Sequence, residues 1–333
     1  MNLSVLDLSF VTTGAPPSQA LRNSLDLAQH CDRLGYTRYW LAEHHNLPSV
    51  ASPAPDLMIG QIAAITRRIR VGSGGVMLPN HAPLVVAERF KTLEALFPGR
   101  IDLGLGRAPG TDQVTAYALR QRMETAGGDD FLERLQELIL WETGGFPEGH
   151  PFRTVQAMPW DAPLPPIWIL GSSDYGARLA AQVGTGFAFA HHFATHEAVA
   201  VMRMYRDRYN RQGWRPDPYA ILAVAVVCAE TDAEAERLAA SMDLNWLRRA
   251  QGEYHPLPSP EEAAAYPYTE ADRARIRKNR ARLFVGNPET VRERLTPLVE
   301  ASGADEIMVT SAIFDHDARK RSYALLAQLY GLS

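Results

Sequence analysis

The sequence predicts a (β/α)8 TIM barrel with an insertion before the last strand, and three observations support this fold class. Short apolar runs of strand length alternate with longer runs of helical spacing along the 333 residues. This alternation indicates a parallel sheet, because a parallel neighbour needs a crossover connection of about a dozen residues or more. Eight such strands occur without a change of composition between the halves, which favours one closed barrel over two domains. A barrel needs about 250 residues, which leaves roughly 80 for insertions.

The first half of the chain contains four predicted strands, each followed by a predicted helix. The first helix has Ser18 as a candidate N-cap and carries apolar residues at helical spacing. The helix after the third strand opens with Pro83, which is favoured in a first turn, and ends before Pro98 and Gly99. The strands are predicted at residues 3–8, 39–42, 69–78 and 101–105, and the helices at residues 18–34, 58–66, 83–96 and 131–141.

The second half repeats this order and holds most of the surplus length. The strand at residues 220–229 is almost entirely apolar, as expected for burial on both faces of a parallel sheet. Residues 250–282 are too many for an ordinary loop, so we predict an insertion, used as a lid or an active-site wall, within a single domain of residues 1–333. The other strands are predicted at residues 166–170, 187–190 and 306–310, and the helices at residues 175–183, 196–210, 232–243 and 317–329.

The composition argues against several classes of protein. Lys and Arg number 34 against 38 Asp and Glu, and no basic block is present, which disfavours a nucleic-acid partner. Cys31 and Cys228 are the only cysteines, so neither a disulfide framework nor a four-cysteine zinc site can form. The first ten residues do not resemble a signal peptide, and no apolar run reaches the roughly 20 residues that span a bilayer. We therefore expect a soluble, cytoplasmic protein that does not contact a membrane.

Polar and glycine residues follow directly after the predicted strands, where the active sites of such barrels lie. They come from strands that are distant in sequence but neighbours in a barrel, so we expect them to converge on one rim. The segments are Glu43, His44 and His45 after the second strand; Gly72, Ser73, Gly74 and Gly75 in the third; Gly104, Gly106 and Arg107 after the fourth; Gly171, Ser172, Ser173 and Asp174 after the fifth; and His191 and His192 after the sixth.

Small residues join the fifth strand to its helix. Gly171, Ser172 and Ser173 leave the backbone N–H groups at the helix start open to an anion, which the helix dipole also favours. The two hydroxyls would complete a phosphate site. The alternative is that Ser173 or Asp174 only caps the helix, and the residues alone leave both interpretations open.

The glycine-rich third strand suggests that a flat group approaches the backbone. Glycine inside a strand leaves nothing to pack, so the strand is either strained, tightly packed against a neighbour, or covered by a planar ring. Gly104 and Gly106 on the next strand favour the ring. Arg107 would then supply a cation for a phosphate or for ring oxygens, and its alternative is an ordinary surface ion pair.

The histidine pairs favour proton transfer over metal binding. Adjacent residues of an extended segment point to opposite sides, so at most one histidine of each pair faces a common centre. No familiar metal-ligand spacing is present, and we expect no metal. Histidine donates and accepts protons near neutral pH, and Glu43 beside His44 would set the tautomer of its ring.

Taken together, these motifs resemble the bacterial luciferase-like, flavin-dependent monooxygenases. The resemblance runs in order over nearly the whole chain, and it implies a (β/α)8 barrel with an insertion before the last strand, commonly as a homodimer. The segments that carry it are YWLAEHH at 39–45, VGSGGVMLP at 71–79, GLGR at 104–107, LGSS at 170–173 and GNPETV at 286–291.

The resemblance also implies a cofactor, a reaction and a set of site residues. The cofactor is FMN, reduced by a separate flavin reductase, which reacts with O2 to give a flavin C4a-(hydro)peroxide that oxidises a small organic substrate. By position, Ser73, Gly74 and Gly75 match the segment, often with a cis peptide, that lies against the isoalloxazine. His44 matches the catalytic base, with Glu43 beside it. The flavin pocket and phosphate site are matched by Arg107, Gly171, Ser172, Ser173 and the backbone of Tyr175.

Departures from luciferase itself limit what the resemblance implies. Ala188 and Ala190 replace bulky residues near the flavin, and Gly171 replaces the glutamate of the phosphate site, so light emission and a long-chain aldehyde substrate are not expected. Two alternatives remain: a deazaflavin-dependent dehydrogenase on the same barrel, and a non-catalytic flavin-binding protein. The substrate depends on the loops at residues 11–17, 111–128 and 250–282.

Overall fold

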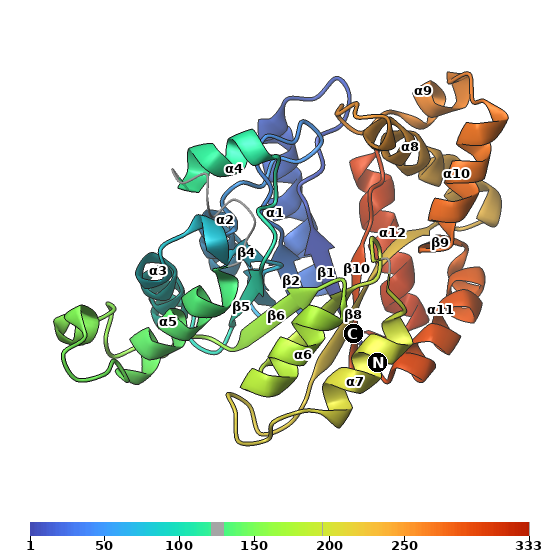
Figure 1. Cartoon of the computed structure of the whole chain (residues 1–333). Helices are drawn as coiled ribbons and strands as arrows, with labels where there is room; N and C mark the ends of the chain where they lie inside the picture. Colours follow the sequence, from blue (N-terminus) through green and yellow to red (C-terminus); the bar gives the residue numbers. More distant parts are fainter. Residues whose placement is uncertain (121–129, 195, 333) are drawn as a thin grey trace.

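Eight parallel strands close into a ring at the centre of the molecule, and helices surround the ring (Figure 1). This computed structural model describes residues 1–120, 130–194 and 196–332. In ring order the strands are β1 (Asn2–Asp7), β2 (Arg38–Leu41), β3 (Arg70–Ser73), β5 (Ile101–Gly106), β6 (Ile167–Gly171), β7 (Gly186–Ala190), β8 (Ala220–Cys228) and β10 (Glu306–Thr310). Strand β10 pairs with β1 on one side and with β8 on the other, which closes the ring. The predicted fold class is confirmed.

Two short strands depart from the predicted set. The strand expected at residues 69–78 is divided into β3 and β4 (Val76–Met77), which both pair with β5, and the peptide bond between Gly74 and Gly75 in the gap is cis. Strand β9 (Leu283–Gly286) is not predicted. It pairs with β8 beyond the point where the pairing with β7 ends, because β8 is long enough to leave part of that edge uncovered.

The helices follow the strands in the predicted order, with two additions outside the predicted insertion, α4 and α11, and with α9 and α10 inside it. Ser18 is not the N-cap of the first helix, because Pro16 holds that position and Pro17 opens the helix. The helices are α1 (Pro17–Arg33), α2 (Pro55–Ile65), α3 (Pro83–Leu96), α4 (Gln113–Arg120), α5 (Phe131–Thr143), α6 (Asp174–Val183), α7 (Ala198–Asp207), α8 (Asp232–Ala250), α9 (Pro260–Ala265), α10 (Glu270–Arg280), α11 (Pro288–Ser302) and α12 (His316–Leu329), with 3-10 turns at Leu78–Asn80 and Pro151–Thr154.

A buried ionic network fills the amino-terminal end of the barrel. Arg38 at the start of β2 donates to Asp102 of β5 at 2.8 Å and to Glu306 of β10 at 3.1 Å. The indole N–H groups of Trp40 and Trp168 also donate to Asp102, at 3.2 and 3.3 Å. Burial alone would raise the pKa of Asp102, but the charges of Arg38 and Arg70 keep it below its usual value. Packed side chains therefore occupy this end, and the opposite rim is left for a ligand.

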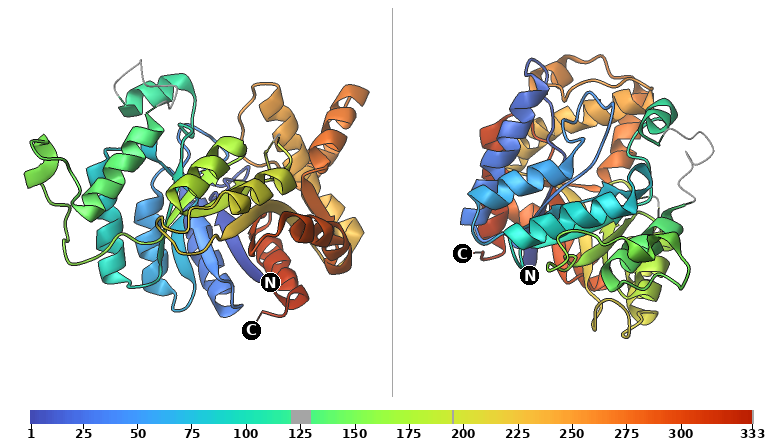
Figure 2. Two further views of the ribbon diagram at one scale, coloured as in Figure 1. Left: turned by 60° about the horizontal axis from the view of Figure 1, so that its bottom comes forward. Right: turned by 90° about the vertical axis from the view of Figure 1, so that its left-hand side faces the viewer.

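The chain ends and the longer excursions lie on different parts of the molecule. Both views of Figure 2 show the N- and C-termini close together. In Figure 1 they lie below the ring, whereas α4, α9 and α10 lie above it. Among the described helices, none combines the length and the apolar character needed to cross a bilayer.

Candidate active site

A cavity of about 530 Å³ lies at the carboxyl ends of the strands. This volume is within the range of about 300–1,000 Å³ that is typical of small-molecule and cofactor sites. Seven of the ten predicted site residues line it, and Glu43, Ser73 and Gly75 do not. The seven are His44, Gly74, Arg107, Gly171, Ser172, Ser173 and Tyr175. The structure therefore brings most of the predicted residues around one space, although they come from four different strands.

The start of α6 is open toward this cavity. Ser173 occupies the N-cap position in an extended conformation, but its side chain makes no capping hydrogen bond. The carboxylate of Asp174 instead pairs with Arg178 at 3.0 Å. The interpretation that one of these side chains caps the helix is therefore wrong. Two hydroxyls and the first N–H groups of α6 remain available to an anion, which a helix start attracts.

Arg107 lies next to this helix start. Its guanidinium carbon is 4.3 Å from the ring centroid of Tyr175, in a cation–π contact. Within the described residues it forms no ion pair, so the alternative of an ordinary surface salt bridge is not observed. A cation stacked on an aromatic ring is held in place without being neutralised, which leaves its charge available to a ligand.

The glycine-rich turn between β3 and β4 faces the cavity through Gly74 alone. A Cβ at Gly74 would lie 2.7 Å from Leu6 Cδ1, so the backbone fits closely against the barrel interior. Ser73 is fully buried, and its hydroxyl donates to the carbonyl of Gly104 at 2.8 Å and accepts from its N–H at 3.0 Å. A Cβ at Gly75 would lie 2.8 Å from Gly104 O. Ser73 and Gly75 therefore pack against β5 and do not line the cavity, and their assignment as cofactor-binding residues stays a prediction.

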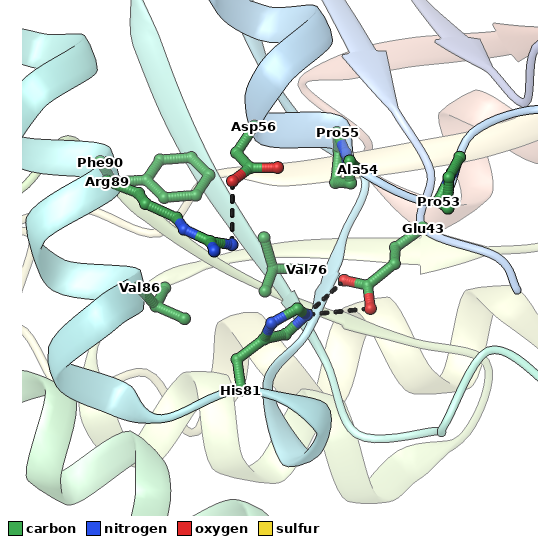
Figure 3. A pocket seen from close by; sticks show the side chains of 10 residues that line it. All are labelled: Glu43, Pro53, Ala54, Pro55, Asp56, Val76, His81, Val86, Arg89 and Phe90. Atoms are coloured by element: carbon green, nitrogen blue, oxygen red, sulfur yellow. Dashed lines mark hydrogen bonds and ion pairs between the residues drawn. The ribbon is translucent and has the colours of Figure 1, made fainter. Parts of the chain in front are cut away.

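Glu43 belongs to a polar cluster, in which its carboxylate points toward His81 (Figure 3). Its fully buried carboxylate accepts from the backbone N–H of Met77 at 2.8 Å and lies 2.9 Å from Nε2 of both His45 and His81. Burial alone would raise the pKa of Glu43, but the hydrogen bonds from His45 and His81 lower it to about 2. This side faces a separate cavity of about 50 Å³. The expectation that Glu43 sets the tautomer of His44 is therefore wrong: the carboxylate anchors the loop around His44.

Two histidines line the main cavity, one from each adjacent pair. His44 and His192 face it, whereas His45 and His191 do not, as the opposite orientation of neighbouring residues predicts. Burial, with a smaller contribution from the positive charge of Arg249, lowers the pKa of His44 to about 4. Burial also lowers the pKa of His192 to about 4. Both rings are therefore neutral at pH 7. In the described part of the chain, no group of three or more His, Cys, Asp or Glu side chains is arranged to hold a metal ion.

These two histidines should make the stability of the protein depend on pH. Between pH 6.5, the ordinary pKa of histidine, and about pH 4, these two side chains are protonated in the unfolded chain but neutral in the folded protein. Stability should therefore fall as the pH is lowered through this window, by up to about 1.4 kcal/mol per pH unit for each histidine. Urea unfolding of the wild type and of His192→Gln between pH 4.5 and 7 measures the slope. The pH dependence of stability should be weaker in His192→Gln than in the wild type. The exposed variant His255→Gln is the control and should keep the wild-type slope. A wild-type slope in His192→Gln would contradict this explanation.

The cavity wall formed by α8 was not predicted from the sequence. Met242, Asn245, Trp246 and Arg249 line the cavity from this helix, and their helical spacing was the available signal. No residue of 250–282 lines it. That segment packs on α8 through ion pairs such as Arg280 with Asp243 at 2.7 Å, and its use as a lid stays a prediction. Of the loop at residues 111–128, positions 121–128 lie outside the described residues.

Comparisons with known proteins match this chain to one family over nearly its whole length. The model of the luciferase-like monooxygenase family matches residues 1–306. The chain is 41% identical over 322 residues to a luciferase-like monooxygenase of Escherichia coli (strain K12), covering 97% of this chain and 95% of the relative. It is 34% identical over 328 residues to N-acetyl-S-alkylcysteine monooxygenase of Bacillus subtilis (strain 168), covering 98% and 97%. The crystal structure of apo-MsnO8 is 40% identical with a TM-score of 0.90, covering 100% and 99%.

More distant solved structures share the fold alone. One is the oxygenating constituent of 3,6-diketocamphane monooxygenase from Pseudomonas putida in complex with FMN, at 21% identity and a TM-score of 0.72, covering 98% of this chain and 97% of that one. Another is an F420-dependent secondary alcohol dehydrogenase in complex with an F420–acetone adduct, at 13% identity and a TM-score of 0.68, with the same coverage. Because the family model and the curated relatives each match nearly the full length, this chain belongs to the luciferase-like monooxygenase family.

Proposed function

We propose that this protein is a flavin-dependent monooxygenase that uses reduced FMN and O2 to oxidise a small organic substrate. The observation that carries the proposal is the open start of α6, where the hydroxyls of Ser172 and Ser173 line the same cavity as the close-fitting backbone of Gly74. A phosphate and a flat ring are the two groups that such a cavity would accept together. The curated relatives named monooxygenases support the reaction class.

The residues present fit FMN. Gly171, Ser172, Ser173 and the backbone of Tyr175 would hold the phosphate at the start of α6, assisted by the cation of Arg107. Gly74 would lie against the ring system, with Ser73 and Gly75 holding the turn from behind. When bound in its reduced form, FMN supplies the electrons that activate O2.

The protein supplies position, a dry environment and a proton acceptor. Leu6, Leu8, Met308 and Trp246 give the cavity apolar walls, which exclude water from the reacting groups. His44 lines the cavity as a neutral ring, and its Nδ1 has no hydrogen-bond partner within the described residues. We assign His44 the role of accepting and returning a proton, while Glu43 positions the loop that carries it.

A separate flavin reductase is part of this proposal. Tyr175 is 39% exposed and Arg107 is also exposed, so the phosphate end of the cavity is accessible from solvent. A cofactor bound at such a mouth can enter in its reduced form and leave after the reaction. A homodimer and a lid formed by residues 250–282 complete the proposal and follow from the resemblance and from chain length.

The phosphate site can be tested by comparing FMN with riboflavin, which lacks the phosphate. The double variant Ser172→Ala/Ser173→Ala should weaken FMN binding by about 100-fold or more, because two hydrogen bonds to a charged group are lost. Riboflavin binding should change little, and the surface variant Ser18→Ala should leave both affinities unchanged. Equal losses for FMN and riboflavin would contradict the assignment. The measurement is the quenching of flavin fluorescence on titration with protein.

The reaction itself is tested with FMNH2, O2 and a panel of substrates. If the folded protein binds neither FMN nor FMNH2, the proposal fails. Tighter binding of F420 than of FMN, with hydride exchange that needs no O2, would support the dehydrogenase alternative. Flavin binding without a product across the panel would support a flavin-binding protein.

A further inference from the structure

One face of α8 closes the cavity on the side of His44. Met242, Asn245, Trp246 and Arg249 follow one another at intervals of three, one and three residues, so they share one face of the helix. Three of the four bring apolar or neutral groups, and Arg249 brings a full positive charge. Arg249 is therefore the one charged side chain among these four residues of α8.

Arg249 differs from the arginines near it because its guanidinium forms no ion pair within the described residues. On the same helix, Arg248 pairs with Glu262 at 2.9 Å, and Arg280 on α10 pairs with Asp243 of α8 at 2.7 Å. Arg249 is exposed and, within residues 1–120, 130–194 and 196–332, it forms no ion pair or hydrogen bond through its side chain. Unlike its neighbours, it has no structural role that explains a cation at the cavity.

The rest of the cavity leaves this charge uncompensated. The described residues that line it include no Asp or Glu. His44 and His192 are neutral at pH 7, so the two cations of the lining are Arg107 and Arg249. Arg107 is stacked on Tyr175 at the start of α6. Arg249 instead lies close enough to His44 to lower its pKa. The two cations therefore serve different parts of the cavity, and only the first adjoins the proposed phosphate site.

We infer that Arg249 binds a carboxylate on the substrate, and that the substrate is otherwise apolar. A guanidinium presents a planar pair of donors that matches a carboxylate, and an uncompensated cation in an apolar cavity favours an anion. Trp246, Met242 and Phe10 provide apolar surface for the remainder of the molecule. The inference rests on the proposed function, because it takes the cavity that would hold FMN as the place where the substrate binds.

The test uses matched pairs of ligands on the full-length, flavin-free protein. Octanoate and 3-phenylpropanoate are compared with their neutral amides by isothermal titration. We expect each carboxylate to bind more tightly than its amide, and Arg249→Met to weaken carboxylate binding by about ten-fold while changing amide binding by less than about two-fold. The carboxylate affinity of Arg249→Lys should fall between those of the wild type and Arg249→Met, because lysine keeps the charge but lacks the planar pair of donors. Arg237→Met, an exposed residue of the same helix outside the cavity, is the charge-matched control.

The same variants separate this inference from the proposed function. Arg249→Met should leave the affinities for FMN and riboflavin unchanged. If it weakens FMN selectively, as the serine variants do, then Arg249 belongs to the phosphate site and the inference is overturned. It is also overturned if no carboxylate binds better than its amide, or if both lose affinity equally in Arg249→Met. A folded protein that binds carboxylates more tightly than their amides but binds no flavin would contradict the proposed function and would still support this inference.

Discussion

Replacing His44 by alanine is expected to lower turnover by about 10²–10⁴-fold, the range that a positioned proton-transfer group contributes. His44 lines the cavity, its ring is neutral at pH 7, and Nδ1 has no partner in the described part of the chain. A ring nitrogen left without a partner at this position is available to the reactants. The affinity for FMN should change by less than about three-fold, because the proposed phosphate site lies at α6.

The pH profile gives a second readout of His44. Because its pKa is lowered to about 4, the ring remains a proton acceptor throughout the neutral range. Wild-type activity should therefore stay level as the pH falls through 6.5, where an unperturbed histidine would lose it, and should decline only towards about 4. Stopped-flow and steady-state rates with FMNH2 and O2 measure the profile.

Two outcomes decide the role of His44. His255→Ala, an exposed histidine outside the cavity, is the control and should match the wild type. If His44→Ala keeps wild-type turnover, then His44 is not the proton acceptor, although the fold and the flavin site would be unaffected. A decline centred near pH 6.5 would indicate that a different group controls the rate.

Replacing Gly104 by alanine should cost about 3 kcal/mol or more of folding free energy, by forcing backbone apart in the barrel wall. A Cβ at this position would lie 2.1 Å from the carbonyl oxygen of Ser73 and 2.9 Å from Leu170 Cδ1. The first contact is with backbone, which cannot rotate away as a side chain would. Ser73 is also hydrogen-bonded to both backbone groups of Gly104, so β3 and β5 would have to separate.

The matched control for Gly104→Ala is Gly60→Ala on α2. There a Cβ would lie 3.4 Å from Leu93 Cδ2, an ordinary contact, and alanine in a helix gains up to about 1 kcal/mol over glycine. Urea unfolding should therefore show a neutral or slightly stabilising change for Gly60→Ala beside the large loss for Gly104→Ala. A Gly104→Ala protein within about 1 kcal/mol of the wild type would show that β3 and β5 can move apart cheaply.

The barrel and its rim could be predicted because their signals are local. Apolar runs such as Ala220–Cys228 and the spacing of the helices depend on neighbours in sequence, and a closed parallel ring follows from their alternation. Strand β9 and the helices α4 and α11 were not predicted. Strand β9 has only four residues, and its partner is the uncovered edge of β8, which depends on how long β7 is. An edge of this kind exists only once the strands are side by side.

What the amino-acid order determined by itself was the barrel, the family resemblance and the set of strand ends that meet around the cavity. The folded chain decided which side chains of that set face the cavity. Glu43 turns to His45 and His81, and Ser73 bonds to Gly104, because successive residues of an extended segment point to opposite sides and burial chooses between them. It also decided that Arg249 lies near enough to His44 to lower its pKa, since these two residues are some 200 positions apart in sequence. The hydrophobic periodicity of a strand or helix can be read from neighbouring residues, but the distance in space between residues far apart in sequence cannot.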